Sequence, residues 1–122
     1  MTKIHTLTDG AYQGDVLIER IDSLPAGLTE VPRTAEGHIV AHSETGHHHA
    51  VTEEHTRYYR PATDTGPEAG MVAYLEVLRE HADVVHLRAW DTHDTLRLPP
   101  GLYRIRRQQE RAPEGWARRV ED

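Results

Sequence analysis

The chain contains no cysteine and no phenylalanine, and only two of its 122 residues are tryptophan. Without cysteine there can be no disulfide bond, thiolate ligand or cysteine nucleophile, so any transition metal must be held by His, Asp or Glu. The scarcity of large apolar side chains and a mean hydropathy of -0.69 predict a modest core. Such a core fits a small barrel or sandwich, or a chain supported by an oligomer or a metal.

Long apolar runs are also missing. No stretch approaches the roughly 18 apolar residues with which a helix crosses a bilayer, and residues 1–5 lack the apolar segment of a secretory leader. We therefore expect a cytoplasmic protein with no membrane partner. The formal net charge of -6 argues against a general nucleic-acid binder, although arginines gather toward the C-terminus.

The length and the turn signals predict one small β domain over residues 1–122. Short alternating segments, bounded by Pro and Gly turns, indicate about eight strands. Examples are residues 15–21, 95–98 and 102–110. We expect an all-β fold, either a barrel or a sandwich, in which a cupin-like barrel is one option.

Residues 71–86 allow two interpretations. One is an amphipathic helix, which would make the fold α+β and whose apolar stripe would be Met71, Leu75, Leu78, Ala82 and Val85. The other is a pair of strands separated by the polar break at residues 79–81. The many β-branched residues on both sides of this break favour two strands.

Residues 38–55 hold six of the ten histidines. Alternation on both sides of residues 43–46 predicts a β-hairpin with this segment as its loop, so that Val40 lies opposite His49. Since side chains alternate along a strand, His42, His47, His49 and Glu53 would share one face. A register slip of one residue would place them on different faces of the hairpin.

Imidazoles and one carboxylate within cross-strand reach are suitable ligands for Zn, Fe, Ni or Mn. We predict His47 and His49 as the first ligands, with His42, Glu53 and His93 as candidates for the rest. A position left open could serve a metal-dependent hydrolase or oxidoreductase. Whether the chain is an enzyme stays open, because histidines on a hairpin can also simply face solvent.

Two further function classes remain. A histidine pair beside Arg104 and Arg106 could cleave a phosphodiester without a metal, as a nuclease. Arg104, Arg106 and Arg107 could instead recruit nucleic acid or an acidic protein in a binding or assembly module, and the chain could form a homo-oligomer. Arginines on strands are more often a solvated face.

Three stretches resemble a family of small proteins from bacteria and their phages. They are Gly14-Asp15-Val16-Leu17-Ile18, Thr45-Gly46-His47-His48-His49 and Leu98-Pro99-Pro100-Gly101-Leu102-Tyr103-Arg104-Ile105-Arg106-Arg107-Gln108-Gln109-Glu110. The resemblance covers nearly the whole chain and implies no particular activity. In that family a segment that is commonly His-Glu-Glu-His precedes the Leu-Pro turn. Here Trp90-Asp91-Thr92-His93 keeps only the last histidine, which makes His93 the matching candidate.

A more distant similarity is to the cupins. Their first motif, His-x-His-x3-Glu, is similar to the pattern of His47, His49 and Glu53. Their second motif has a histidine after a Pro-x-Gly turn, where this chain has Arg104. The similarity therefore implies only an architecture and a placement for ligands.

Overall fold

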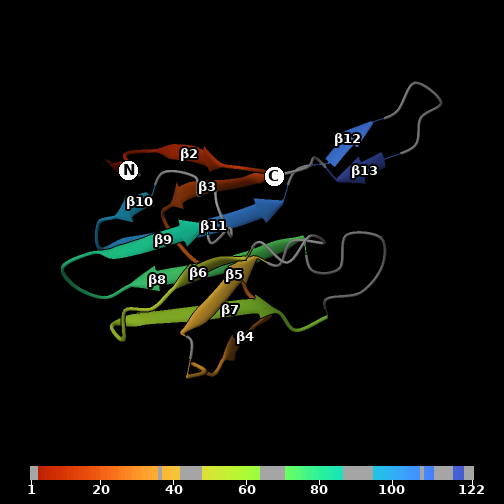
Figure 1. Cartoon of the computed structure of the whole chain (residues 1–122). Helices are drawn as coiled ribbons and strands as arrows, with labels where there is room; N and C mark the ends of the chain where they lie inside the picture. Colours follow the sequence, from red (N-terminus) through yellow and green to blue (C-terminus); the bar gives the residue numbers. More distant parts are fainter. Residues whose placement is uncertain are drawn as a thin grey trace.

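The structure is a computed structural model that describes residues 3–35, 37–41, 48–63, 71–86, 95–107, 109–111 and 117–119. These residues form two β-sheets packed face to face as a sandwich (Figure 1). The all-β class is confirmed, and the sheets do not close into a barrel. None of the described residues is helical, so the α+β alternative is wrong.

One sheet has five strands in the order β1-β10-β9-β6-β5. They are β1 (Ile4–Thr6), β10 (Thr95–Leu98), β9 (Ala82–His86), β6 (His49–Val51) and β5 (His38–Ala41). Strand β1 runs parallel to β10, and the other neighbours are antiparallel. The predicted strand at residues 95–98 is therefore present with the expected bounds.

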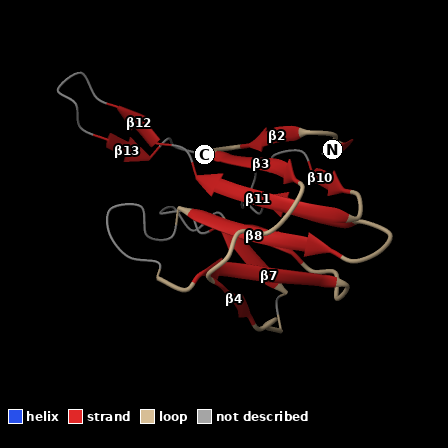
Figure 2. Ribbon diagram, turned by 180° about the vertical axis from the view of Figure 1, so that it is seen from behind, coloured by secondary structure: helices blue, strands red, loops and turns tan. Residues whose placement is uncertain are grey.

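The other sheet has six antiparallel strands in the order β2-β3-β11-β8-β7-β4. They are β2 (Gly10–Gln13), β3 (Val16–Ile21), β11 (Gly101–Arg107), β8 (Val72–Val77), β7 (Thr56–Pro61) and β4 (Leu28–Val31). Figure 2 shows this sheet from its outer side. A third pairing, β12 (Gln109–Arg111) with β13 (Ala117–Arg119), is separate from both sheets.

The core lies between the two sheets and follows the alternation of the strands. Val16 and Ile18 of β3 are buried, as are Tyr103 and Ile105 of β11, because each pair occupies alternate positions on one face of its strand. The core cluster is completed by residues of both sheets, among them Val40, Val51, Tyr58, Ala73, Leu75, Val77, Ala82, Val84, Leu96 and Leu98.

Residues 71–86 form the two strands β8 and β9. Arg79 and Glu80, in the predicted polar break at residues 79–81, are exposed, and Glu80 has a φ of 57°, which a tight turn requires. Alternating burial along both strands decides against the helix, because every second side chain enters the core.

The histidine hairpin forms with a register that is only partly as predicted. His38 pairs with Val51 and Ile39 with Ala50, which is the expected alignment. An irregularity then places Ala41, rather than Val40, opposite His49. Such a bulge adds a residue to one strand, and the side chains of the partner strand keep their original faces. His49 therefore still faces the core, while the expected loop at residues 43–46 lies outside the described residues.

Within the part of the chain that the structure describes, no helix is long and apolar enough to cross a membrane.

Candidate functional site

The predicted metal ligands fall into two separate groups. His42, His47 and His93 lie outside the described residues, so their role stays a prediction. His49 and Glu53 are described, and they join different clusters of side chains. His49 lies between the sheets with Nε2 toward Asp15, whereas Glu53 follows the end of β6 and lies beside His81 and Asp83.

Glu53 belongs to a cluster at one end of the five-stranded sheet. Glu53, His81 and Asp83 each offer one ligand atom, and these atoms lie within 4.8 Å of one another. The pairing of Val51 with Val84 explains the cluster, since it brings the chain after β6 beside the start of β9. His81 and Asp83 are two residues apart, so they project from the same side of the strand.

Hydrogen bonds fix two members of this triad. The backbone N–H of Asp83 donates to Oε2 of Glu53 at 3.2 Å. The other carboxylate oxygen of Glu53, Oε1, is buried and has no hydrogen-bond partner among the described residues. Nε2 of His55 donates to the backbone carbonyl of His81 at 2.6 Å, which holds the turn before β9.

Arg97 neutralises part of the charge at the triad. Arg97 is on β10 and lies directly opposite Asp83 of β9. Its guanidinium donates to both oxygens of Asp83 at 2.9 and 3.0 Å. This hydrogen bonding raises the pKa of Arg97, and the charges of Asp83 and Glu53 act in the same direction. Two carboxylates facing one guanidinium leave a net negative charge, which favours a cation.

A second cluster of polar side chains is buried between the sheets. The amide nitrogen of Gln13 donates to the backbone carbonyl of Val84 at 2.8 Å, and its oxygen lies 2.8 Å from Nδ1 of His49. Nε2 of His49 lies 3.5 Å from Oδ1 of Asp15. Nη2 of Arg107 donates to Oδ2 of the same carboxylate at 3.2 Å. Asp15 and His49 are each only 1% exposed.

The ring of His49 stacks on that of His86, its cross-strand partner on β9. The ring centroids are 4.1 Å apart and the planes differ by 2°. Stacking on one face and the contact with Gln13 at one edge fix the orientation of the His49 ring.

The carboxyl of Asp15 is held in its ionised form. Burial by itself would raise its pKa, but the neighbouring His49 and the hydrogen bond and charge of Arg107 lower the pKa below its ordinary value. The cluster therefore contains a buried carboxylate with a compensating guanidinium on one of its oxygens.

The three arginines predicted as an anion site do not share one surface. Arg104 and Arg106 lie on the outer face of the six-stranded sheet, where both contact the carboxylate of Glu19 at 3.1 Å. Arg107 points inward to Asp15 and is 6% exposed. The metal-free nuclease would require histidines beside Arg104 and Arg106. His49 faces inward and therefore does not lie beside either arginine.

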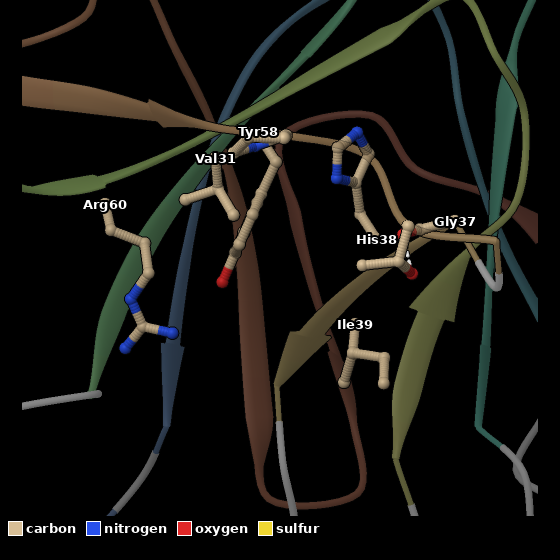
Figure 3. A pocket seen from close by; sticks show the side chains of 8 residues that line it. Val31, Gly37, His38, Ile39, Tyr58 and Arg60 are labelled. Carbon is tan, nitrogen blue, oxygen red and sulfur yellow. Dashed lines mark hydrogen bonds between the residues drawn. The ribbon is translucent and has the colours of Figure 1, made fainter.

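A pocket of about 250 Å³ opens between the edge strands β4 and β5. Figure 3 shows His38 and Tyr58 side by side in its wall, with Val31, Ile39 and Arg60 around them. The rings of His38 and Tyr58 are 5.6 Å apart. Burial lowers the pKa of His38, and the charge of Arg33 lowers it further. Nothing in the sequence pattern predicted this pocket.

Sequence reasoning did not identify His81 and Asp83, nor Asp15, as members of a site. In the sequence, His81 belongs to the polar break and Asp83 to the start of the strand that follows. The spacing His-x-Asp nevertheless places both on one side of a strand. Asp15 stood at the start of a predicted strand. Its partners His49 and Arg107 lie far away in sequence, so no local signal could connect them.

Comparison with known proteins identifies a family. Residues 12–108 match the model of a family described as Domain of unknown function (DUF8820), and the chain belongs to this family. No curated protein and no solved structure matches the chain significantly.

Proposed function

We propose that this member of the DUF8820 family is a metal-binding protein and that Glu53, His81 and Asp83 hold a divalent ion. The observation that carries the proposal is the approach of three ligand atoms to within 4.8 Å of one another. Small rotations of the side chains would bring these atoms to coordination distances of about 2.0–2.2 Å from one ion.

The surroundings of Glu53 support a cation at this position. Its Oε2 is held by the N–H of Asp83, while its Oε1 is buried without a hydrogen bond from any described residue. A buried carboxylate oxygen without a partner is costly. A metal ion would satisfy this oxygen and would also relieve the repulsion between the carboxylates of Glu53 and Asp83.

The ligand types narrow the choice of metal. Two carboxylates and one imidazole suit Zn²⁺, Mn²⁺ or Fe²⁺ better than a soft, thiolate-seeking ion. All three residues are partly exposed, so water can reach the remaining coordination positions. Three protein ligands with open positions are typical of catalytic rather than structural sites.

A divalent ion with an open position supplies an acidified water molecule, which is the chemistry of metal-dependent hydrolysis. The chain's own contribution would be to hold the ligands: the Asp83 amide orients Glu53, whereas Arg97 competes with the ion for the Asp83 carboxylate. We therefore place a hydrolase ahead of an oxidoreductase, because an acidified water molecule is all that hydrolysis requires of the ion.

Calorimetric titration of untagged, metal-free protein with Zn²⁺ and with Mn²⁺ tests the proposal. We expect Glu53→Gln and His81→Ala to weaken binding at one site by about tenfold or more, at least the loss seen when a supporting partner of a ligand is removed. Glu54→Gln is the matched control, since it removes the same charge from the exposed neighbouring residue. Equal affinities in all four proteins would contradict the proposal.

A further inference from the structure

We propose that a second, structural metal ion is held between the sheets by Nε2 of His49 and Oδ1 of Asp15. This site is separate from the Glu53–His81–Asp83 triad and involves the opposite end of the paired strands β6 and β9. Each atom is buried, and neither has a hydrogen-bond partner among the described residues. Both residues are 1% exposed, so bulk water does not supply hydrogen bonds to these two atoms.

Gln13 determines which nitrogen of His49 is available. The Val84 carbonyl can only accept a hydrogen bond, so the side-chain nitrogen of Gln13 must point at it. The oxygen of Gln13 then faces Nδ1 of His49 and requires a proton on that nitrogen. In the neutral ring this leaves a lone pair on Nε2, directed toward the carboxylate of Asp15.

Two acceptor atoms that face each other need something positive between them, and their separation discriminates among the candidates. A shared proton would give a charge-assisted bond of about 2.7–2.9 Å. A bridging water that donates to both atoms would hold them about 4.4 Å apart. An ion with bonds of about 2.0–2.2 Å and a tetrahedral angle places them about 3.3–3.6 Å apart. The observed distance of 3.5 Å agrees with the ion.

The neighbours of the pair hold it in a geometry suited to coordination. Arg107 occupies Oδ2 of Asp15 and leaves Oδ1 directed at His49. A ligating histidine usually donates its other N–H to a carbonyl or carboxylate, which fixes the ring, and here the side-chain oxygen of Gln13 accepts the Nδ1–H of His49. The ring of His86 covers one face of His49.

The location indicates a structural role. His49 comes from the five-stranded sheet, whereas Asp15 precedes β3 and Arg107 ends β11 in the six-stranded sheet. An ion held by both ligands would therefore link the two sheets. An ion that binds only the folded state stabilises it, which suits a chain with a modest apolar core.

Long-range ¹H–¹⁵N spectra of the histidine rings test the proposal in a chain carrying His81→Ala, which disables the triad. On addition of Zn²⁺ we expect the Nε2 resonance of His49 to shift while Nδ1 keeps its proton. We also expect one bound Zn²⁺ per chain, at least about tenfold weaker or lost in Asp15→Asn and His49→Gln. His38→Gln is the matched control, a buried histidine on the neighbouring strand.

The outcomes separate this proposal from the first one. A His49 ring that does not respond to Zn²⁺, or Zn²⁺ binding that persists in Asp15→Asn, would overturn the structural ion. Glu53→Gln and His81→Ala in an otherwise unchanged chain report only on the triad. If His49→Gln fails to fold, the ring spectra and Asp15→Asn still decide the question.

Discussion

Arg107 and Asp15 form an ion pair inside the sandwich, with 3.2 Å between Nη2 and Oδ2 and with 6% and 1% of the side chains exposed. Replacing Arg107 by Met would leave the carboxylate buried without its guanidinium. We expect the free energy of unfolding to fall by about 3–5 kcal/mol.

Arg106→Met is the control for this prediction, because Arg106 is on the same strand but contacts Glu19 on the outer face. Exposed ion pairs contribute about 0–1 kcal/mol. Urea unfolding of the two variants checks the difference, and similar losses in both would show that Arg107 is not acting as a buried partner.

The second prediction concerns Arg97, which holds both oxygens of Asp83. Arg97→Gln removes a positive charge beside the proposed ion and frees the Asp83 carboxylate. We expect Zn²⁺ to bind the triad several-fold more tightly, by roughly threefold to tenfold, and the gain to shrink at high salt. Titration at low and high ionic strength measures this, and weaker binding in Arg97→Gln would be evidence against a cation at the triad.

The third prediction is a dependence of stability on pH that arises from His38. Burial and the charge of Arg33 lower the pKa of His38 below 6.5 in the folded chain. The unfolded chain therefore takes up a proton first as the pH falls, and the folded state loses stability from about pH 6.5 down through the folded pKa. Above about pH 7 His38 is neutral in both states, and its pKa shift does not change the free energy of unfolding.

His38→Gln removes this contribution. The free energy of unfolding, measured from about pH 7.5 to about pH 5, should fall less steeply in the variant than in the unmodified chain. Parallel curves would mean that His38 accepts a proton as easily in the folded chain as in the unfolded one.

The fourth prediction concerns Gly37, which precedes the histidine hairpin. It has a φ of +90°, and a Cβ there would collide with the backbone carbonyl of Val51. Gly27 also has a positive φ, of +80°, but a Cβ at that position meets nothing within 4 Å. We expect Gly37→Ala to cost about 2–4 kcal/mol and Gly27→Ala only about 1 kcal/mol, from backbone strain alone. Thermal unfolding would detect the difference, and equal melting temperatures would refute the close approach.

Much of the fold could be predicted because the strands alternate between core and solvent. The faces of β11 followed from this pattern, with Tyr103 and Ile105 buried and Arg104 outside. Strand β2 could not be predicted in the same way. Gly10 and the Gln13-Gly14 pair are ordinary turn signals, yet residues 10–13 pair with β3 and bring Gln13 to His49.

The candidate site was less predictable than the fold. The hairpin forms where the alternation predicted it, but the bulge before Ala41 left no signal in the sequence. Glu53 was expected beside the hairpin histidines, whereas its ligand-type neighbours His81 and Asp83 come from the chain at the start of β9. Pairing of strands distant in sequence determines such contacts, and one strand's alternation does not reveal its partner.

Anomalous diffraction at the zinc absorption edge, from crystals grown with Zn²⁺, tests the central claim most directly. We predict a peak within about 2.0–2.2 Å of a ligand atom from each of Glu53, His81 and Asp83. Crystals that contain Zn²⁺ at other positions, with no anomalous density between these three side chains, would contradict it.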